Sequence, residues 1–100
     1  MKNLGNCVVV STLEDADKVA RSISFGERFN IIFESTNIKI YFFDIIQNHI
    51  PEVSIINCDS KLDRFLKDIN NIYDFVIFDN VKKCPDINII KEIKNKILIC

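Results

Sequence analysis

Five short apolar runs recur along the chain, and stretches with helical periodicity separate them. The runs cover residues 7–10, 29–33, 53–58, 73–79 and 96–100. Runs of this length are typical of buried strands, whereas longer stretches with apolar residues every three or four positions are typical of helices that pack one face on a sheet. Strands that alternate with helices indicate crossover connections and a parallel sheet.

The stretches between the runs carry start and stop signals of helices. Ser11 and Glu14 have the spacing of a capping box, and so do Ser60 and Asp63. Gly26 is placed where it can end the first helix. We therefore expect four helices, one between each successive pair of runs.

Residues 37–49 fit two patterns. Ile38, Ile40 and Phe42 alternate with polar neighbours, which would suit a hairpin strand. On a helix, one arc collects Ile38, Phe42, Ile45, Ile46 and His49. The helical pattern accounts for more residues and runs longer, so we favour a helix, with His49 as a packed side chain rather than a ligand.

These elements predict a single α/β domain over residues 1–100, with a doubly wound, flavodoxin-like or Rossmann-like fold. It would contain a mostly parallel five-stranded sheet and about four helices. With strand order 2-1-3-4-5, the first helix would lie alone on its face of the sheet. Since a parallel sheet needs both faces covered, we expect a second copy of the chain or another protein to bind there.

Composition excludes several kinds of site. Two Gly cannot form a glycine-rich phosphate loop, and one His cannot form a multi-histidine metal site. A net charge of −1 gives no positive field for nucleic acid. The N-terminal sequence lacks a signal-peptide core and no apolar run is long enough for a membrane span, so we expect a cytoplasmic protein that binds no membrane.

The four cysteines, Cys7, Cys58, Cys84 and Cys100, form no CxxC pair and are expected to be free thiols. Cys84 precedes an expected helix and follows two lysines. Because helix N-termini and cations stabilise thiolates, Cys84 is the candidate reactive thiol. No His or Asn at a recognised spacing supports a catalytic role for it.

Polar residues follow the predicted strands at their carboxyl ends, where open parallel sheets bind ligands. The candidate ligand or metal residues are Glu34, Asp59, Asp79 and Asn80. If their strands are neighbours, the three carboxylates suit Mg²⁺, the one cofactor considered. The alternative is structural, because acids after strands commonly cap the next helix.

Part of the chain resembles the receiver domains of response regulators. The residues that carry the resemblance are 73–79, 85–86 and 89–94, which are similar to the phosphoacceptor strand and the helix after it, and 30–35, which are similar to the first strand with its acidic pair. The resemblance extends over residues 29–100 and implies a receiver-like α/β fold.

In that register Asp79 takes the place of the phosphorylated aspartate, and Glu34 takes the place of one acid. Ser35 stands where the family has its second acid, and the last strand with its lysine is absent. The resemblance thus implies a pseudo-receiver that has lost phosphotransfer.

Taken together, these patterns favour a small regulatory or assembly module that binds a protein partner or a second copy of itself and is not an enzyme. The alternative is a domain centred on Asp79 that uses the carboxyl edge of the sheet to bind Mg²⁺ and accept phosphate, or to bind a small ligand.

Overall fold

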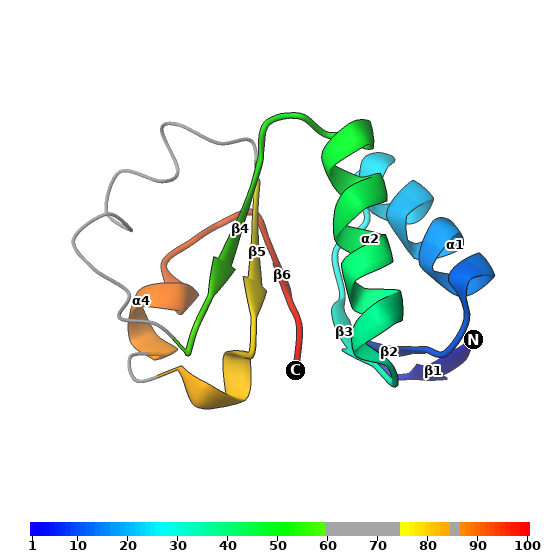
Figure 1. Ribbon diagram of the computed structural model, residues 1–100. Coiled ribbons are helices and arrows are strands. Elements are labelled where there is room, and N and C mark those ends of the chain that lie inside the picture. Colours follow the sequence, from blue (N-terminus) through cyan, green and yellow to red (C-terminus); the bar gives the residue numbers. More distant parts are fainter. Residues whose placement is uncertain (60–74, 85–86) are drawn as a thin grey trace. The chain divides into compact units, whose positions relative to one another are not determined.

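The computed structural model describes residues 1–59, 75–84 and 87–100, and its chain divides into two compact units, Met1–Pro51 and Glu52–Cys100 (Figure 1). Each unit contains one three-stranded sheet. Within the described ranges, no helix has the length and apolar character needed to cross a bilayer. The expectation of one domain over the whole chain stays a prediction.

The first unit holds a mixed sheet and two helices. Its elements are β1 (Lys2–Leu4), β2 (Cys7–Val10), α1 (Leu13–Ser24), β3 (Asn30–Phe33) and α2 (Thr36–His49). The strand order is β1-β2-β3, with β1 antiparallel to β2 and β2 parallel to β3. The two predicted strands of this unit are therefore confirmed, and β1 is an additional one.

Helix α1 begins and ends with satisfied backbone groups. Thr12 is its N-cap, and the Thr12 hydroxyl accepts a hydrogen bond of 3.0 Å from the Asp15 backbone N–H. Ser11 was expected to be the cap, so the predicted start is wrong by one residue. Gly26, with φ of 97°, ends the helix as predicted, because a left-handed conformation there costs glycine little.

Residues 36–49 form helix α2, which confirms the helical interpretation of this stretch. Phe42 and Ile46, one helical turn apart, are fully buried, and the ring centroid of Phe42 lies 5.2 Å from that of Phe33 on β3. The polar residues within this stretch therefore mark half-buried positions on a helix, not the solvent-facing side of a strand.

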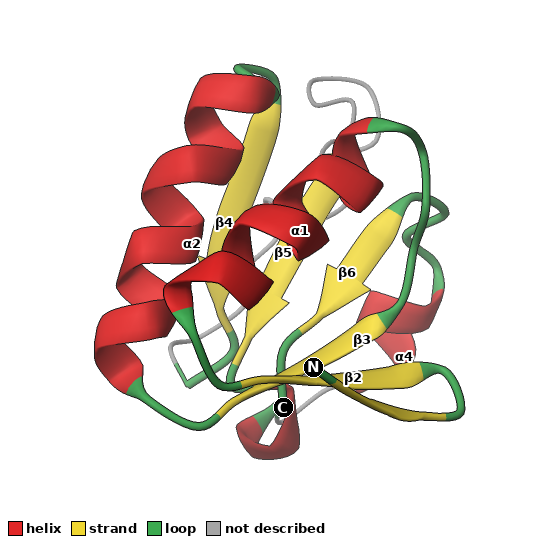
Figure 2. Ribbon diagram, turned by 90° about the vertical axis from the view of Figure 1, so that its right-hand side faces the viewer, coloured by secondary structure: helices red, strands yellow, loops and turns green. Residues whose placement is uncertain are grey.

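Helices α1 and α2 lie side by side (Figure 2). The Tyr41 hydroxyl on α2 donates to the Asp17 carboxylate on α1 at 3.0 Å. The expectation that the first helix lies alone on its sheet face is therefore wrong. The uncovered sheet face that this expectation implied therefore gives no argument for a bound protein partner.

The second unit holds an all-parallel sheet. Its described elements are β4 (Val53–Asn57), β5 (Phe75–Asp79), the 3₁₀-helix η2 (Val81–Lys83), α4 (Ile87–Lys91) and β6 (Lys96–Leu98). β5 lies between β4 and β6 in the order β4-β5-β6. All five residues of β5 are buried, as its continuous apolar sequence predicts. The helix expected from Ser60 onward lies outside the described residues.

The predicted single five-stranded sheet with four helices is wrong. All five apolar runs contain strands, but they belong to two three-stranded sheets, and three α-helices are described. The physical reason is β1. The predicted order assigned one edge of residues 7–10 to residues 53–58, whereas in the structure Lys2–Leu4 turns back at Gly5 and occupies an edge of β2. A three-residue strand with two polar residues gives no apolar run that would reveal it.

The core of the second unit depends on Phe78 in the central strand. Phe78 is fully buried, in a cluster that also contains Cys58, Val76, Ile90 and Ile93. The cluster joins β5 to the segment that follows β4 and to α4.

Replacing Phe78 with alanine is expected to lower the free energy of unfolding by about 3–5 kcal/mol, because the cavity left in a packed core adds to the lost transfer energy. Urea unfolding followed by circular dichroism measures the loss. The control is Ile40→Ala: Ile40 is 52% exposed on α2, so its removal is expected to change stability by about 1 kcal/mol or less. Equal losses for the two variants would contradict this account of the core.

Candidate functional site

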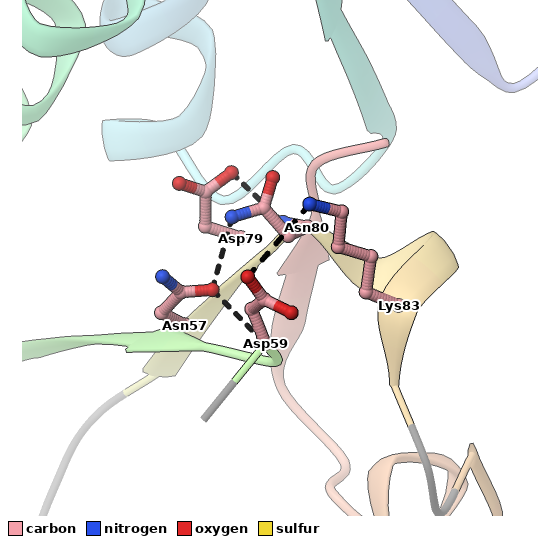
Figure 3. A network of polar contacts seen from close by, with 5 residues as sticks. All are labelled: Asn57, Asp59, Asp79, Asn80 and Lys83. Atoms are coloured by element: carbon pink, nitrogen blue, oxygen red, sulfur yellow. Dashed lines mark hydrogen bonds and ion pairs between the residues drawn. The ribbon is translucent and has the colours of Figure 1, made fainter. Parts of the chain in front are cut away.

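Two strands of the second unit bring their carboxyl ends to one edge of the sheet. β4 and β5 are parallel, and their pairing places Asn57 opposite Asp79. The residues that follow each strand therefore meet there (Figure 3). We call residues 57–59 and 79–84 the β4–β5 edge.

The Asn57 side chain links the two segments of this edge. Its Oδ1 atom accepts a hydrogen bond from the Asp59 backbone N–H and another from the Asn80 side-chain Nδ2, each at 2.9 Å (Figure 3). The first bond is a local turn of the kind that asparagine favours after a strand. The second joins residues 23 positions apart, so Asn57 fixes the end of β4 against the end of β5.

The chain turns sharply after β5 at Asn80. Its φ of 57° and ψ of 45° are left-handed, and Asn80 is the non-glycine residue with positive φ in the described chain. Asparagine tolerates this region better than most residues, because its short polar side chain can bond locally. The Asp79 carboxylate, on a residue only 7% exposed, accepts a 2.8 Å hydrogen bond from the Asn80 backbone N–H. Asp79 therefore stabilises the turn.

An ion pair closes the outer side of the edge. Lys83 Nζ lies 3.7 Å from Asp59 Oδ2, and both side chains are more than half exposed. An ion pair this exposed contributes about 0–1 kcal/mol to stability, so it orients the two side chains more than it stabilises the fold.

Two thiols lie beneath these polar groups. Cys58 is fully buried, and its backbone N–H donates to the Asp79 carbonyl at 2.8 Å. Cys84 packs against the apolar cluster to which Cys58 belongs. Burial, the neighbouring Cys84 side chain and the Asp79 carboxylate raise the pKa of Cys58 to about 12. Cys58 is therefore a neutral thiol near pH 7.

The structure gathers most of the predicted site residues. Asp59, Asp79, Asn80 and Cys84 all lie at the β4–β5 edge, whereas Glu34 is an exposed residue of the first unit, after β3. The edge thus has two of the three carboxylates that the sequence suggested for Mg²⁺. Among the residues that the structure describes, no group of three or more His, Cys, Asp or Glu side chains is arranged to hold a metal ion.

Asn57, Cys58 and Lys83 also belong to this edge; they follow or end predicted strands but were not among the candidate site residues. Asn57 had a usable signal, since an asparagine two positions before Asp59 at the end of a strand is typical of a side-chain-stabilised turn. The closeness of Cys58 to Cys84 depends on the pairing of β4 with β5, because 26 residues separate the two cysteines in the sequence.

Asn80→Ala is expected to lower the free energy of unfolding by about 1–2 kcal/mol, because alanine resists the left-handed conformation and loses the bond to Asn57. Asn80→Gly is the matched variant: it loses the same bond and relieves the backbone, so its loss is expected to be smaller. Urea unfolding of the two variants measures both. A glycine variant at least as destabilised as the alanine variant would show that the turn carries no backbone cost.

Comparison with known proteins found no relative of this chain. Neither family models, curated proteins nor solved structures gave a match to the chain, so the resemblance to receiver domains stays a prediction and the site stands on its own geometry.

Proposed function

We propose that this chain is a small regulatory or assembly module of the cytoplasm that acts by binding a protein, and that its first partner is a second copy of itself. The observation that carries the proposal is Phe25, an aromatic residue that is 83% exposed at the end of α1. Aromatic side chains contribute disproportionately to protein–protein contacts.

The turn that holds Phe25 is fixed by backbone hydrogen bonds. The Gly26 N–H donates to the Ile23 carbonyl at 3.0 Å, and the Glu27 N–H donates to the Ser22 carbonyl at 3.1 Å. These two bonds form the Schellman motif that commonly ends a helix. Because the backbone on both sides of Phe25 is ordered, a partner that covers the ring pays little entropy for the turn itself.

Arg28 adds an ordered cation to the same turn. Its Nη1 atom donates to the Ile23 carbonyl at 2.9 Å and to the Glu27 carbonyl at 2.7 Å. Aromatic residues and arginine are both enriched in protein–protein interfaces. This turn, residues 24–28, is the proposed contact surface.

Sedimentation velocity over a concentration series tests the proposal. The wild-type chain is expected to self-associate. Phe25→Ala is expected to weaken the dimer about 100-fold or more, since it removes two Phe side chains from each dimer and burying one contributes about 1.5–3 kcal/mol. Ile87→Ala is the control: Ile87 is also exposed and apolar but belongs to the other unit, so the dimer should be unchanged.

A monomeric wild-type chain would leave a different protein as the partner. A photocrosslinking benzophenone residue at position 25 should then give a defined adduct in cells that produce the protein, and the same residue at position 87 should not. If the chain is monomeric and position 25 gives no such adduct, the proposed function is overturned.

The second candidate function is binding of Mg²⁺ or a small ligand at the β4–β5 edge. It is favoured by the Asp79 carboxylate, which is buried at the end of the central strand with the exposed Asp59 side chain at the same edge. In this case millimolar Mg²⁺ should shift the amide NMR signals of residues 57–59 and 79–84, and beryllofluoride should add to the shift. The signals of residues 24–28 serve as the internal control. Unchanged signals at the edge would remove this candidate.

A further inference from the structure

The β4–β5 edge contains a pair of thiols that no other part of the proposed function uses. Cys58 follows β4 directly, and Cys84 directly follows η2. Cys58 is a member of the apolar cluster built on Phe78, and Cys84 packs against that cluster. Two thiols that meet at one small apolar cluster are candidates for a covalent bond of about 2.05 Å.

The two backbones that carry these thiols are held in place independently. The Cys58 N–H donates to the Asp79 carbonyl at 2.8 Å, and the Cys84 N–H donates to the Val81 carbonyl at 3.2 Å. The Asn57–Asn80 hydrogen bond and the Asp59–Lys83 ion pair join the same two segments, and Asn57, Asp59 and Lys83 are direct sequence neighbours of the cysteines. The backbone of the β4–β5 edge therefore holds the two thiols near each other, and their proximity does not depend on one side-chain rotamer.

The two sulfurs differ in access. Cys84 is half-buried and lies at the end of an exposed pair of lysines, whereas Cys58 is fully buried. A solvent oxidant reaches Cys84 first, and a buried thiol in contact with it is placed to complete the reaction. An accessible cysteine next to a resolving cysteine is the arrangement typical of redox-sensing pairs.

We propose that Cys58 and Cys84 are a redox-sensitive pair that forms an intramolecular disulfide when a hydroperoxide oxidises Cys84. In the first step the Cys84 sulfur attacks an oxygen of the hydroperoxide. An S–O bond forms, the O–O bond breaks, and the thiol proton leaves with the departing oxygen as water or an alcohol. Cys84 is then a sulfenic acid.

In the second step the Cys58 sulfur attacks the Cys84 sulfur. The S–S bond forms, the S–O bond breaks, and hydroxide leaves with the proton of Cys58 as water. The two thiols together lose two electrons and two protons, and the hydroperoxide gains them. A thiol reductant reverses the reaction. The disulfide locks the end of β4 to the end of η2 across the edge.

Oxidation of the reduced, full-length chain with hydrogen peroxide tests the proposal. Remaining thiols are alkylated, the protein is digested, and linked peptides are identified by mass spectrometry. The expected main product links Cys58 to Cys84, leaves Cys7 and Cys100 alkylated, disappears with dithiothreitol, and raises the urea midpoint, because it constrains the unfolded chain between residues 58 and 84.

Three cysteine variants separate the roles of the two sulfurs. Cys84→Ser is expected to reduce the linked product to background and to leave Cys58 as a thiol, while Cys100→Ser, at an exposed cysteine, leaves the yield unchanged. Cys58→Ala should leave Cys84 as a sulfenic acid that dimedone traps.

Three results would overturn the proposal. They are a main product that links any other pair of cysteines, a wild-type Cys84 oxidised to sulfinic acid beside an unmodified Cys58, and a linked product that survives in Cys84→Ser. All of these readouts are covalent and intramolecular, so they can be obtained from a monomer. Failure of the dimer proposal therefore leaves this one intact, and the reverse also holds.

Discussion

The parallel pairing of β5 with β4 is the interaction on which the rest of the second unit depends. It sets Asn57 opposite Asp79, and this register brings two turns, one buried carboxylate and two thiols to the same edge. A shift of one residue would send Phe78 to the opposite face and expose part of the core. The apolar cluster around Phe78 thus fixes the register, and the register fixes the chemistry of the edge.

Local structure follows closely from the sequence. The apolar runs contain strands, and residues 37–49 form the helix that their periodicity favours, because burial of Phe42 and Ile46 outweighs the strand-like alternation near Ile38. Strand pairing, in contrast, does not follow from the local sequence. It depends on which backbone edges are free, and Lys2–Leu4 takes an edge of β2 with residues that carry no apolar signal. The number of sheets could therefore not be obtained from periodicity.

In the candidate site, too, the local features follow from the sequence, whereas the features that depend on strand order do not. Asp79 and Asn80 are conspicuous in the sequence because a carboxylate and an amide directly follow a buried strand, and the structure places both in the network around Asn57. Glu34 looks equivalent in the sequence, yet it belongs to the other unit. Proximity across a sheet edge needs the strand order, whereas a turn such as that at Asn80 needs only its own residues.

The antiparallel strand β1 affects how readily further chains can add to the sheet of the first unit. An apolar strand such as β2, with Val8, Val9 and Val10 in succession, would template the addition of further chains if its side remained open. β1 covers that side with three exposed residues, among them Lys2. An edge strand this short and charged is a poor template for further strands, so β1 protects the β2 side of the sheet from edge-to-edge association.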